Sequence, residues 1–162
     1  MAEAADAPGL RWAVKASFLS YVASLSDGAM SVTSGALEVP EGFLFPVRDH
    51  RRFDARTGIG TLCFAGDVRF RAYRGMLQLR IADPQLHADE DGAVLTVEDA
   101  AAERVVIADL DTPRRARGGG LEVPASLAPG AEHYFNNAYP EGTVLDPLVI
   151  RGIWDPPARK TD

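Results

Sequence analysis

The sequence predicts a mostly β protein, an antiparallel β-sandwich with an N-terminal helix and a short C-terminal helix. Apolar residues recur every three or four positions near the N-terminus, and after Gly28 the pattern changes to alternation with period two. The chain also holds 15 glycines and 11 prolines among 162 residues, a share that indicates many turns. Many short strands need a second layer over their apolar faces, which favours a sandwich.

The first predicted element is a helix over about residues 10–25. Its apolar side chains are spaced mostly three and four residues apart, so they share one face: Leu10, Val14, Phe18, Tyr21, Val22 and Leu25. Pro8 suits a first helical turn, and Asp27-Gly28 supplies a stop. We expect the helix to pack across one end of the sandwich through these side chains, apart from Leu10 and Tyr21.

Short runs between turn residues predict the strands. They are Ala29–Thr33, Ala36–Val39, Phe43–Val47, Gly60–Tyr73, Met76–Ala82, Val94–Glu98, Arg104–Leu110, Leu121–Val123 and Thr143–Arg151. Along the fourth run, Arg69, Arg71 and Tyr73 alternate with apolar residues and therefore share one face. Arg74-Gly75 fits the tight turn of a hairpin.

The remaining segments are predicted to be less regular. Residues 48–56 and 113–120 are rich in arginine and lack periodicity, so we expect solvated loops rather than anion sites. Ala131–Ala138 has the spacing of a short helix, and the charged tail from Asp155 is expected to fray. The prediction is one domain over residues 1–162, with an ordered core over about residues 9–154.

Composition argues against several classes of function. The net charge of −6 disfavours nucleic acid or an anionic membrane surface as the main partner. No run approaches the roughly 20 apolar residues of a membrane-spanning helix. A single cysteine, Cys63, excludes an internal disulfide, and its apolar surroundings predict a buried, inert thiol. The N-terminus has no leader pattern, so we expect a cytoplasmic protein unless a leader has been removed.

The usual enzyme signatures are missing from the sequence. There is no dinucleotide-binding glycine motif, P-loop, zinc-protease motif or serine-hydrolase elbow. His50, His87 and His133 lie far apart in polar contexts, and we expect exposed loop histidines rather than a metal triad. These observations favour a binding protein over an enzyme and identify no reaction.

Two tyrosines stand out as candidate binding residues. Tyr21 lies on the apolar helix face, where an aliphatic side chain would pack more simply. It is either a core aromatic with its hydroxyl at the rim or a phenol that meets a ligand. Tyr73 shares a strand face with Arg69 and Arg71, which is either a stacked surface cluster or a site for an anionic ligand.

Four sequence blocks carry a family resemblance. They are Leu10–Val22, Gly42–Pro46, Phe64–Leu79 with Asp83-Pro84 after it, and Phe135–Pro147. In their order and spacing they resemble the HtaA-type haem-binding domain, which is found in actinobacterial haem uptake proteins. The resemblance covers about residues 10–150, nearly the whole chain.

The resemblance implies a β-sandwich with a groove for one haem and Tyr21 as the axial ligand of ferric iron. Ser17, one turn earlier, would reach the same groove. Tyr73 would line the opposite wall, and Arg69 or Arg71 would pair with the haem propionates. The sequence departs from the family at Tyr73, where the family motif has a histidine before the turn, and it lacks the export signal of the uptake proteins.

Three functions remain open at this point. The first is haem binding in a groove between Tyr21 and the hairpin over residues 69–75. The second is a cytoplasmic binder or enzyme for another planar or polycyclic hydrophobic molecule, with Tyr21 and Tyr73 as hydrogen-bond donors or a general acid. The third is a structural or partner-binding sandwich whose groove is empty. In the first two cases the expected partner is haem or a small hydrophobic ligand.

Overall fold

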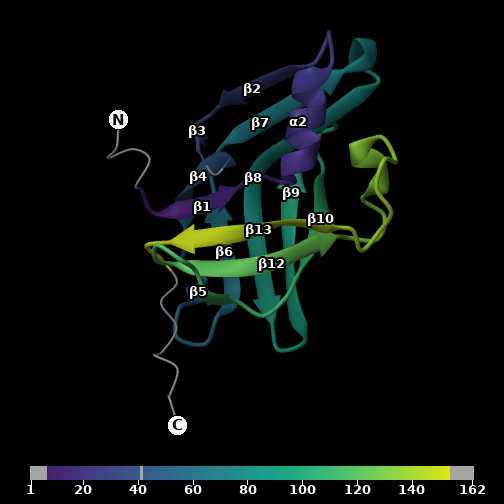
Figure 1. Cartoon of the computed structure of the whole chain (residues 1–162). Coiled ribbons are helices and arrows are strands. Elements are labelled where there is room, and N and C mark those ends of the chain that lie inside the picture. The colour runs from purple at the N-terminus through teal and green to yellow at the C-terminus, as the bar shows by residue number, and fades with distance from the viewer. Residues whose placement is uncertain (1–6, 41, 154–162) are drawn as a thin grey trace.

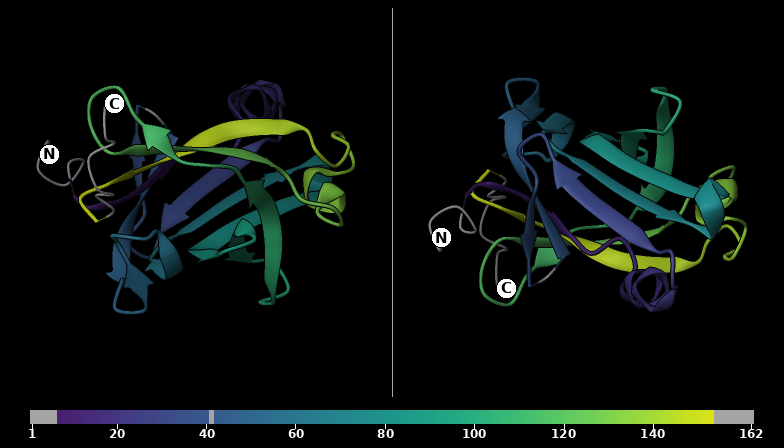
Figure 2. Two further views of the ribbon diagram at one scale, coloured as in Figure 1. Left: turned by 90° about the horizontal axis from the view of Figure 1, so that it is seen from below. Right: turned by 90° about the horizontal axis from the view of Figure 1, so that it is seen from above.

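A computed structural model describes residues 7–40 and 42–153, and its centre is a closed antiparallel β-barrel (Figures 1 and 2). Among the described residues, eight strands follow one another around the ring, and the pairing of β6 with β8 closes it. In ring order they are β8 (Leu77–Asp89), β9 (Gly92–Glu98), β10 (Arg104–Leu110), β12 (Leu121–Leu127), β13 (Val144–Arg151), β1 (Gly9–Trp12), β4 (Gly42–Asp49) and β6 (Ile59–Phe64).

The barrel corrects the predicted sandwich, while the mostly β, antiparallel character is confirmed. The difference arises at residues 9–12, which form the strand β1 and not the start of a helix. Leu10 and Val14 are four residues apart, a spacing that fits both a helix face and a strand face. Trp12, fully buried between them, belongs to the strand pattern.

β1 is the strand that joins two parts of the ring. It pairs with β13, where Leu10 lies opposite Ile150, and with β4, where Leu10 lies opposite Phe45. If residues 9–12 are assigned to a helix, no strand remains between β13 and β4. The closed barrel therefore could not emerge from that reading, because without β1 the other seven strands form one open sheet with β4 and β13 at its edges.

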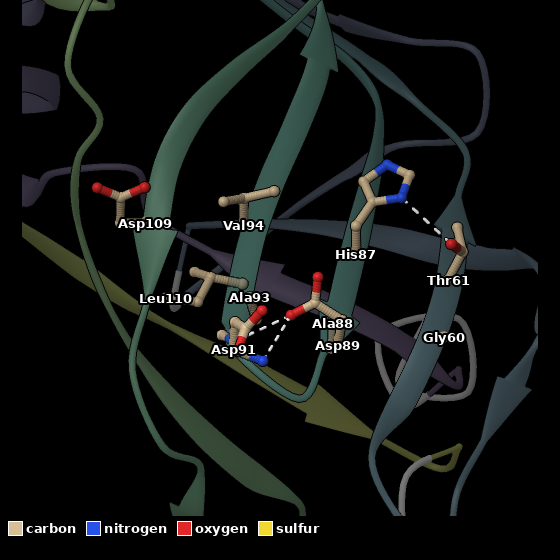
Figure 3. A pocket seen from close by; sticks show the side chains of 11 residues that line it. Gly60, Thr61, His87, Ala88, Asp89, Asp91, Ala93, Val94, Asp109 and Leu110 are labelled. Atoms are coloured by element: carbon tan, nitrogen blue, oxygen red, sulfur yellow. Dashed lines mark hydrogen bonds between the residues drawn. The ribbon is translucent and has the colours of Figure 1, made fainter.

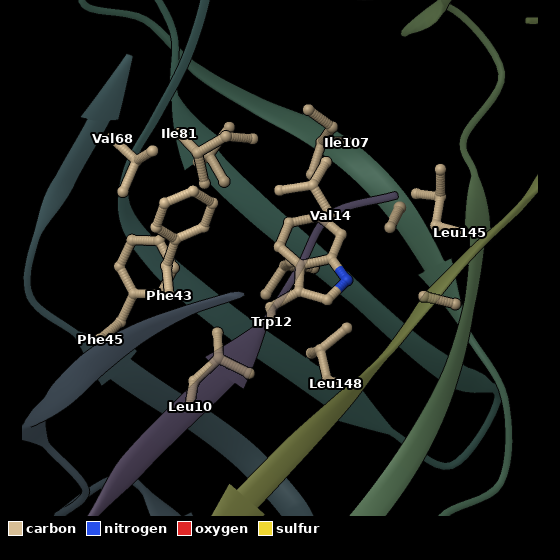
Figure 4. Close-up of a cluster of buried hydrophobic side chains, with 14 of the residues drawn as sticks. Leu10, Trp12, Val14, Phe43, Phe45, Val68, Ile81, Ile107, Leu145 and Leu148 are labelled. Atoms are coloured by element: carbon tan, nitrogen blue, oxygen red, sulfur yellow. The ribbon is translucent and has the colours of Figure 1, made fainter. Parts of the chain in front are cut away.

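The barrel interior is a packed apolar core (Figure 4). Its largest fully buried side chains include Trp12, Phe43, Phe45 and Phe64. The indole N–H of Trp12 donates to the backbone oxygen of Asp146 at 2.7 Å, so the one polar atom of this side chain keeps a partner. Cys63 is buried, as the sequence predicts.

A smaller sheet extends from one end of the barrel, and we call it the flap. It consists of β2 (Ala29–Thr33), β7 (Asp67–Ala72) and residues 77–82 of β8. The second half of β8 pairs instead with β6 inside the barrel. One long strand is therefore shared between barrel and flap, and in Figure 1 the flap lies at the top.

The predicted strand Gly60–Tyr73 is in fact two strands, β6 and β7. The chain breaks between them at Ala65-Gly66, where Gly66 has φ 138°. A Cβ atom on Gly66 would lie 2.6 Å from the Cβ of Ala36, so only glycine fits this close approach. At this point the chain leaves the barrel and enters the flap.

The single α-helix of the described residues, α2 (Ala16–Ser24), covers the inner face of the flap. Phe18 and Val22 are buried there, as predicted, and the Phe18 ring packs edge-on against Phe70 with centroids 5.5 Å apart. The backbone N–H of Ala16 donates to Oδ1 of Asp146 at 3.1 Å. This bond caps a helix that has no side-chain cap of its own.

The remaining elements are short. They are β3 (Leu37–Val39), β5 (Phe53–Asp54), β11 (Arg114–Arg115) and the 3₁₀ turns η1 (Tyr73–Gly75) and η2 (Glu132–Phe135). The predicted C-terminal helix over Ala131–Ala138 is thus only the turn η2, and the two predicted loops each contain a two-residue strand. The predicted frayed tail from Asp155, and the last residue of the predicted ordered core, lie outside the described residues.

The turn η2 is tied to the barrel by a hydrogen bond between side chains. The Tyr134 hydroxyl donates to Oδ2 of Asp99 at 3.0 Å, while backbone N–H groups of Ala101 and Glu103 donate to Oδ1. Burial raises the pKa of Asp99, but these donors outweigh it and hold the pKa below its ordinary value. Burial, followed by the bond to Asp99, raises the pKa of Tyr134 to about 12.

Tyr134→Phe is expected to lower the free energy of unfolding by about 1.5–3 kcal/mol at pH 7, the range for a hydrogen bond to a charged group. The pKa of Asp99 is lowered by folding, so its contribution is present above the unfolded pKa of about 3.9 and is lost as the pH falls through the folded value. Urea unfolding at pH 7 and pH 3 measures this. A difference between the two proteins that does not shrink at pH 3 contradicts the assignment.

Candidate ligand site

Tyr21 and Tyr73 lie side by side where α2 meets the turn at the end of the flap. Tyr21 comes from α2 and Tyr73 from η1, and their ring centroids are 6.3 Å apart with the planes tilted by 49°. The side chains are 41% and 38% exposed, respectively. This contact places Tyr21 beside the β7–β8 hairpin, where the sequence predicts the ligand groove. No hydrogen bond from either phenol is present within the described part of the chain.

An unusual backbone turn presents Tyr73. Tyr73, Arg74 and Gly75 all have positive φ, at 53°, 56° and 88°. The backbone N–H of Arg74 donates to Oδ2 of Asp27 at 2.8 Å, and the backbone N–H groups of Arg74 and Tyr73 hold the pKa of Asp27 below its ordinary value. The turn is thereby fixed to the segment that follows α2.

A hollow of about 570 Å³ opens beside this turn, lined by Leu25, Ser26, Asp27, Tyr73 and Arg74. Within residues 7–40 and 42–153 no carboxylate pairs with the Arg74 guanidinium. Sequence reasoning missed Asp27 and Arg74 as site residues. The sequence identified Asp27 only as a helix stop and Arg74 only as a turn residue. Nothing local in the sequence shows that these two turns, 47 residues apart, are joined by a hydrogen bond.

Two exposed methionines occur at the flap, Met30 in its strand β2 and Met76 after the turn η1. Met30 lies opposite Phe70 in the β2–β7 register, so it points to the flap face that α2 covers, at the outer edge. Met76 directly follows η1 and is 80% exposed. Both methionines are therefore apolar side chains exposed at the flap or its turn.

Arg69 and Arg71 do not join this group. Residues alternate along β7, and Phe70 points to α2, so the two arginines point to the opposite face of the flap. There Arg69 pairs with Asp67 at 3.0 Å, and Arg80 pairs with the same carboxylate at 2.9 Å. Tyr73 was expected to share their face. It departs because β7 ends at Ala72 and the positive φ of Tyr73 turns its ring towards Tyr21.

Ser17 keeps its predicted relation to Tyr21. It lies one turn earlier on α2 and is exposed. Residues four apart on a helix are neighbours on its surface, so Ser17 and Tyr21 lie on the same flank of α2.

A second hollow, of about 520 Å³, lies outside the barrel near the β8–β9 turn (Figure 3). His87 lies there on β8 and not in the exposed loop predicted for it. Its Nδ1 is 3.2 Å from Oγ1 of Thr61, and its Nε2 is 3.2 Å from Oγ1 of Thr96. Burial, and then nearby arginines, lower the pKa of His87. Oδ1 of Asp89 accepts two backbone N–H groups of its own turn, so these polar groups already have protein partners.

Two further features are absent from the described residues. In the described ranges no group of three histidine, cysteine or acidic side chains is placed to hold a metal ion. No helix among those residues is long and apolar enough to cross a membrane. The tyrosine pair and the hollow beside it are the strongest candidate site.

The architecture defines the class of protein as a small antiparallel β-barrel domain with a helix-covered flap. The family follows from the sequence: the HtaA family model matches residues 8–151, and the chain belongs to this family.

Solved structures agree on the fold. The N-terminal domain of HtaA from Corynebacterium glutamicum is 21% identical with a TM-score of 0.72, and the match covers 87% of this chain and 93% of that one. The C-terminal domain of the same protein is 22% identical with a TM-score of 0.65, covering 86% and 92%. The haem-binding protein HtaB from the same organism is 17% identical with a TM-score of 0.62, covering 87% and 89%. Comparison with the curated proteins gives no match.

Proposed function

We propose that this domain binds ferric haem on the flap, with Tyr21 as the axial ligand. The observation that carries the proposal is the exposed pair of Tyr21 and Tyr73 with no hydrogen-bond partner for either phenol among the described residues. Membership of the HtaA family and the fold shared with HtaB, a haem-binding protein, support it.

The residues present suit such a ligand chemically. A phenolate oxygen favours ferric iron, and the charge of the iron favours ionisation of the phenol. Tyr73 can donate a hydrogen bond to the ligating oxygen of Tyr21. Arg74 lines the adjacent hollow and is a cation suited to a carboxylate of the ligand. It takes this role in place of Arg69 and Arg71, which point away. Met76, which directly follows η1 and is 80% exposed, can offer apolar contact to a flat ring system.

A second candidate function is the binding of another planar hydrophobic molecule. The observation that favours it is Tyr73 itself, a phenol at the position where the family motif has a histidine. Two neighbouring phenols can donate hydrogen bonds to a polar edge of a polycyclic ligand without any metal.

Titration with haemin, followed by the Soret absorption, tests the proposal. The wild-type protein is expected to give a saturable one-to-one Soret shift with the charge-transfer band of a ferric tyrosinate complex. The variant Tyr73→His separates the two candidates. If the wild type gives no Soret shift and Tyr73→His does, haem is rejected as the ligand and another small molecule is favoured.

A further inference from the structure

We propose that Asp27 is a positioning residue of this site, whose carboxylate holds the η1 turn so that Tyr73 stays beside Tyr21. The role in ligand binding rests on the proposed function. The effect on the position of Tyr73 does not, because it concerns the protein alone.

The η1 turn needs an external support. Tyr73 and Arg74 are consecutive residues with side chains, and both adopt positive φ. This region is disfavoured for residues other than glycine, asparagine and aspartate. Within the described residues, the Asp27 carboxylate is the side-chain group from outside the hairpin that accepts a hydrogen bond from this turn's backbone, at the Arg74 N–H. A carboxylate acceptor makes it a charge-assisted bond.

Asp27 also connects the two elements that carry the tyrosines. It lies three residues after the end of α2, which carries Tyr21, and it contacts η1, which carries Tyr73. The nearby N–H of Gly28 donates to the backbone oxygen of Leu25 at 3.1 Å. A Cβ on Gly28 would lie 2.0 Å from the backbone oxygen of Val22. The segment that bears Asp27 is therefore folded tightly against the end of the helix.

The bond does not depend on the Arg74 side chain, since its donor is a backbone N–H. No guanidinium or ammonium group of the described residues forms an ion pair with the Asp27 carboxylate. Its oxygens are therefore available to the backbone of η1. We therefore expect the Asp27 carboxylate to fix the position of the η1 backbone, and replacing Asp27 should loosen that turn.

The first experiment uses the protein without ligand. In the Asp27→Ala variant, the Arg74 amide is expected to exchange with solvent about tenfold faster than in the wild type. The nuclear Overhauser contacts between the Tyr21 and Tyr73 rings should weaken. Asp27→Asn keeps one acceptor oxygen and should restore both signals in large part. Asp89→Ala is the matched control, because Asp89 also accepts two backbone N–H groups of a turn, at the far end of β8; it should change neither signal.

The second experiment measures haemin affinity. Asp27→Ala is expected to weaken binding about tenfold, and to add nothing further in a Tyr73→Ala background, because Asp27 acts through Tyr73. The inference is overturned if Asp27→Ala weakens haemin binding as much in the Tyr73→Ala protein as in the wild type. It is also overturned if Asp27→Ala leaves the contact between the Tyr21 and Tyr73 rings, or the exchange rate of the Arg74 amide, unchanged. If the wild type does not bind haemin, the proposed function fails, and the experiment without ligand still decides the role of Asp27.

Discussion

Tyr21→Phe is expected to abolish the tyrosinate charge-transfer band and to weaken haemin binding by about 100-fold or more, a loss beyond that of an outer-shell partner. The substitution keeps the aromatic ring and removes only the oxygen that would ligate iron. The side chain is 41% exposed and its phenol has no hydrogen-bond partner among the described residues. The stability of the protein should therefore be unchanged, which separates ligation from folding.

Tyr139→Phe is the matched control for this experiment. Tyr139 contacts Phe135 with ring centroids 5.9 Å apart and lies under the ammonium of Lys15. Phenylalanine preserves both contacts, so haemin affinity and spectrum should stay as in the wild type. Equal affinity and an unchanged spectrum in Tyr21→Phe would reject Tyr21 as the ligand and leave the fold assignment intact.

Phe18→Ala is expected to lower the free energy of unfolding by about 3–5 kcal/mol, the range for a buried aromatic. Phe18 is 1% exposed, and its ring packs edge-on against Phe70 and Phe135. It joins three elements, namely α2, the flap and η2, so its loss leaves a cavity where they meet. For a chain of this length the melting temperature should fall by about 10 °C.

Met76→Ala is the control for this loss of packing. Met76 is 80% exposed, and surface substitutions usually change stability by less than about 0.5 kcal/mol. Thermal unfolding followed by circular dichroism compares the three proteins. An unchanged melting temperature in Phe18→Ala would show that α2 is not packed on the flap as described.

The sequence allowed most of the strands to be predicted, because alternation and turn residues are local signals. Arg104–Leu110 was predicted with the boundaries that the structure has. The barrel was missed because its closure depends on pairings between distant residues, such as Leu10 with Ile150. A period-two pattern shows that a strand has a buried face, and it does not show which strand lies next to it.

The candidate site was predictable in part. Family resemblance and helix spacing singled out Tyr21, and strand alternation together with the family resemblance singled out its partner Tyr73. The assignment of Arg69 and Arg71 to the same face relied on extrapolating strand alternation through Tyr73. The alternation ends at Ala72, where φ changes sign in the next residue. A left-handed residue with a large side chain gives no strong signal in a single sequence, because glycine is the residue expected there.

The shared strand β8 has a consequence for how such a domain changes over evolutionary time. The residues that close the ring lie in the barrel, whereas Tyr73 and its turn lie at the end of the flap, beyond the bend at Asp83-Pro84, and Tyr21 lies on the helix that covers the flap. The positions of the proposed ligand site and the positions that close the barrel are therefore largely separate sets. A turn such as Tyr73–Gly75 can accumulate substitutions that alter what is bound while the barrel persists. A lineage can in this way diversify its ligands on an inherited scaffold.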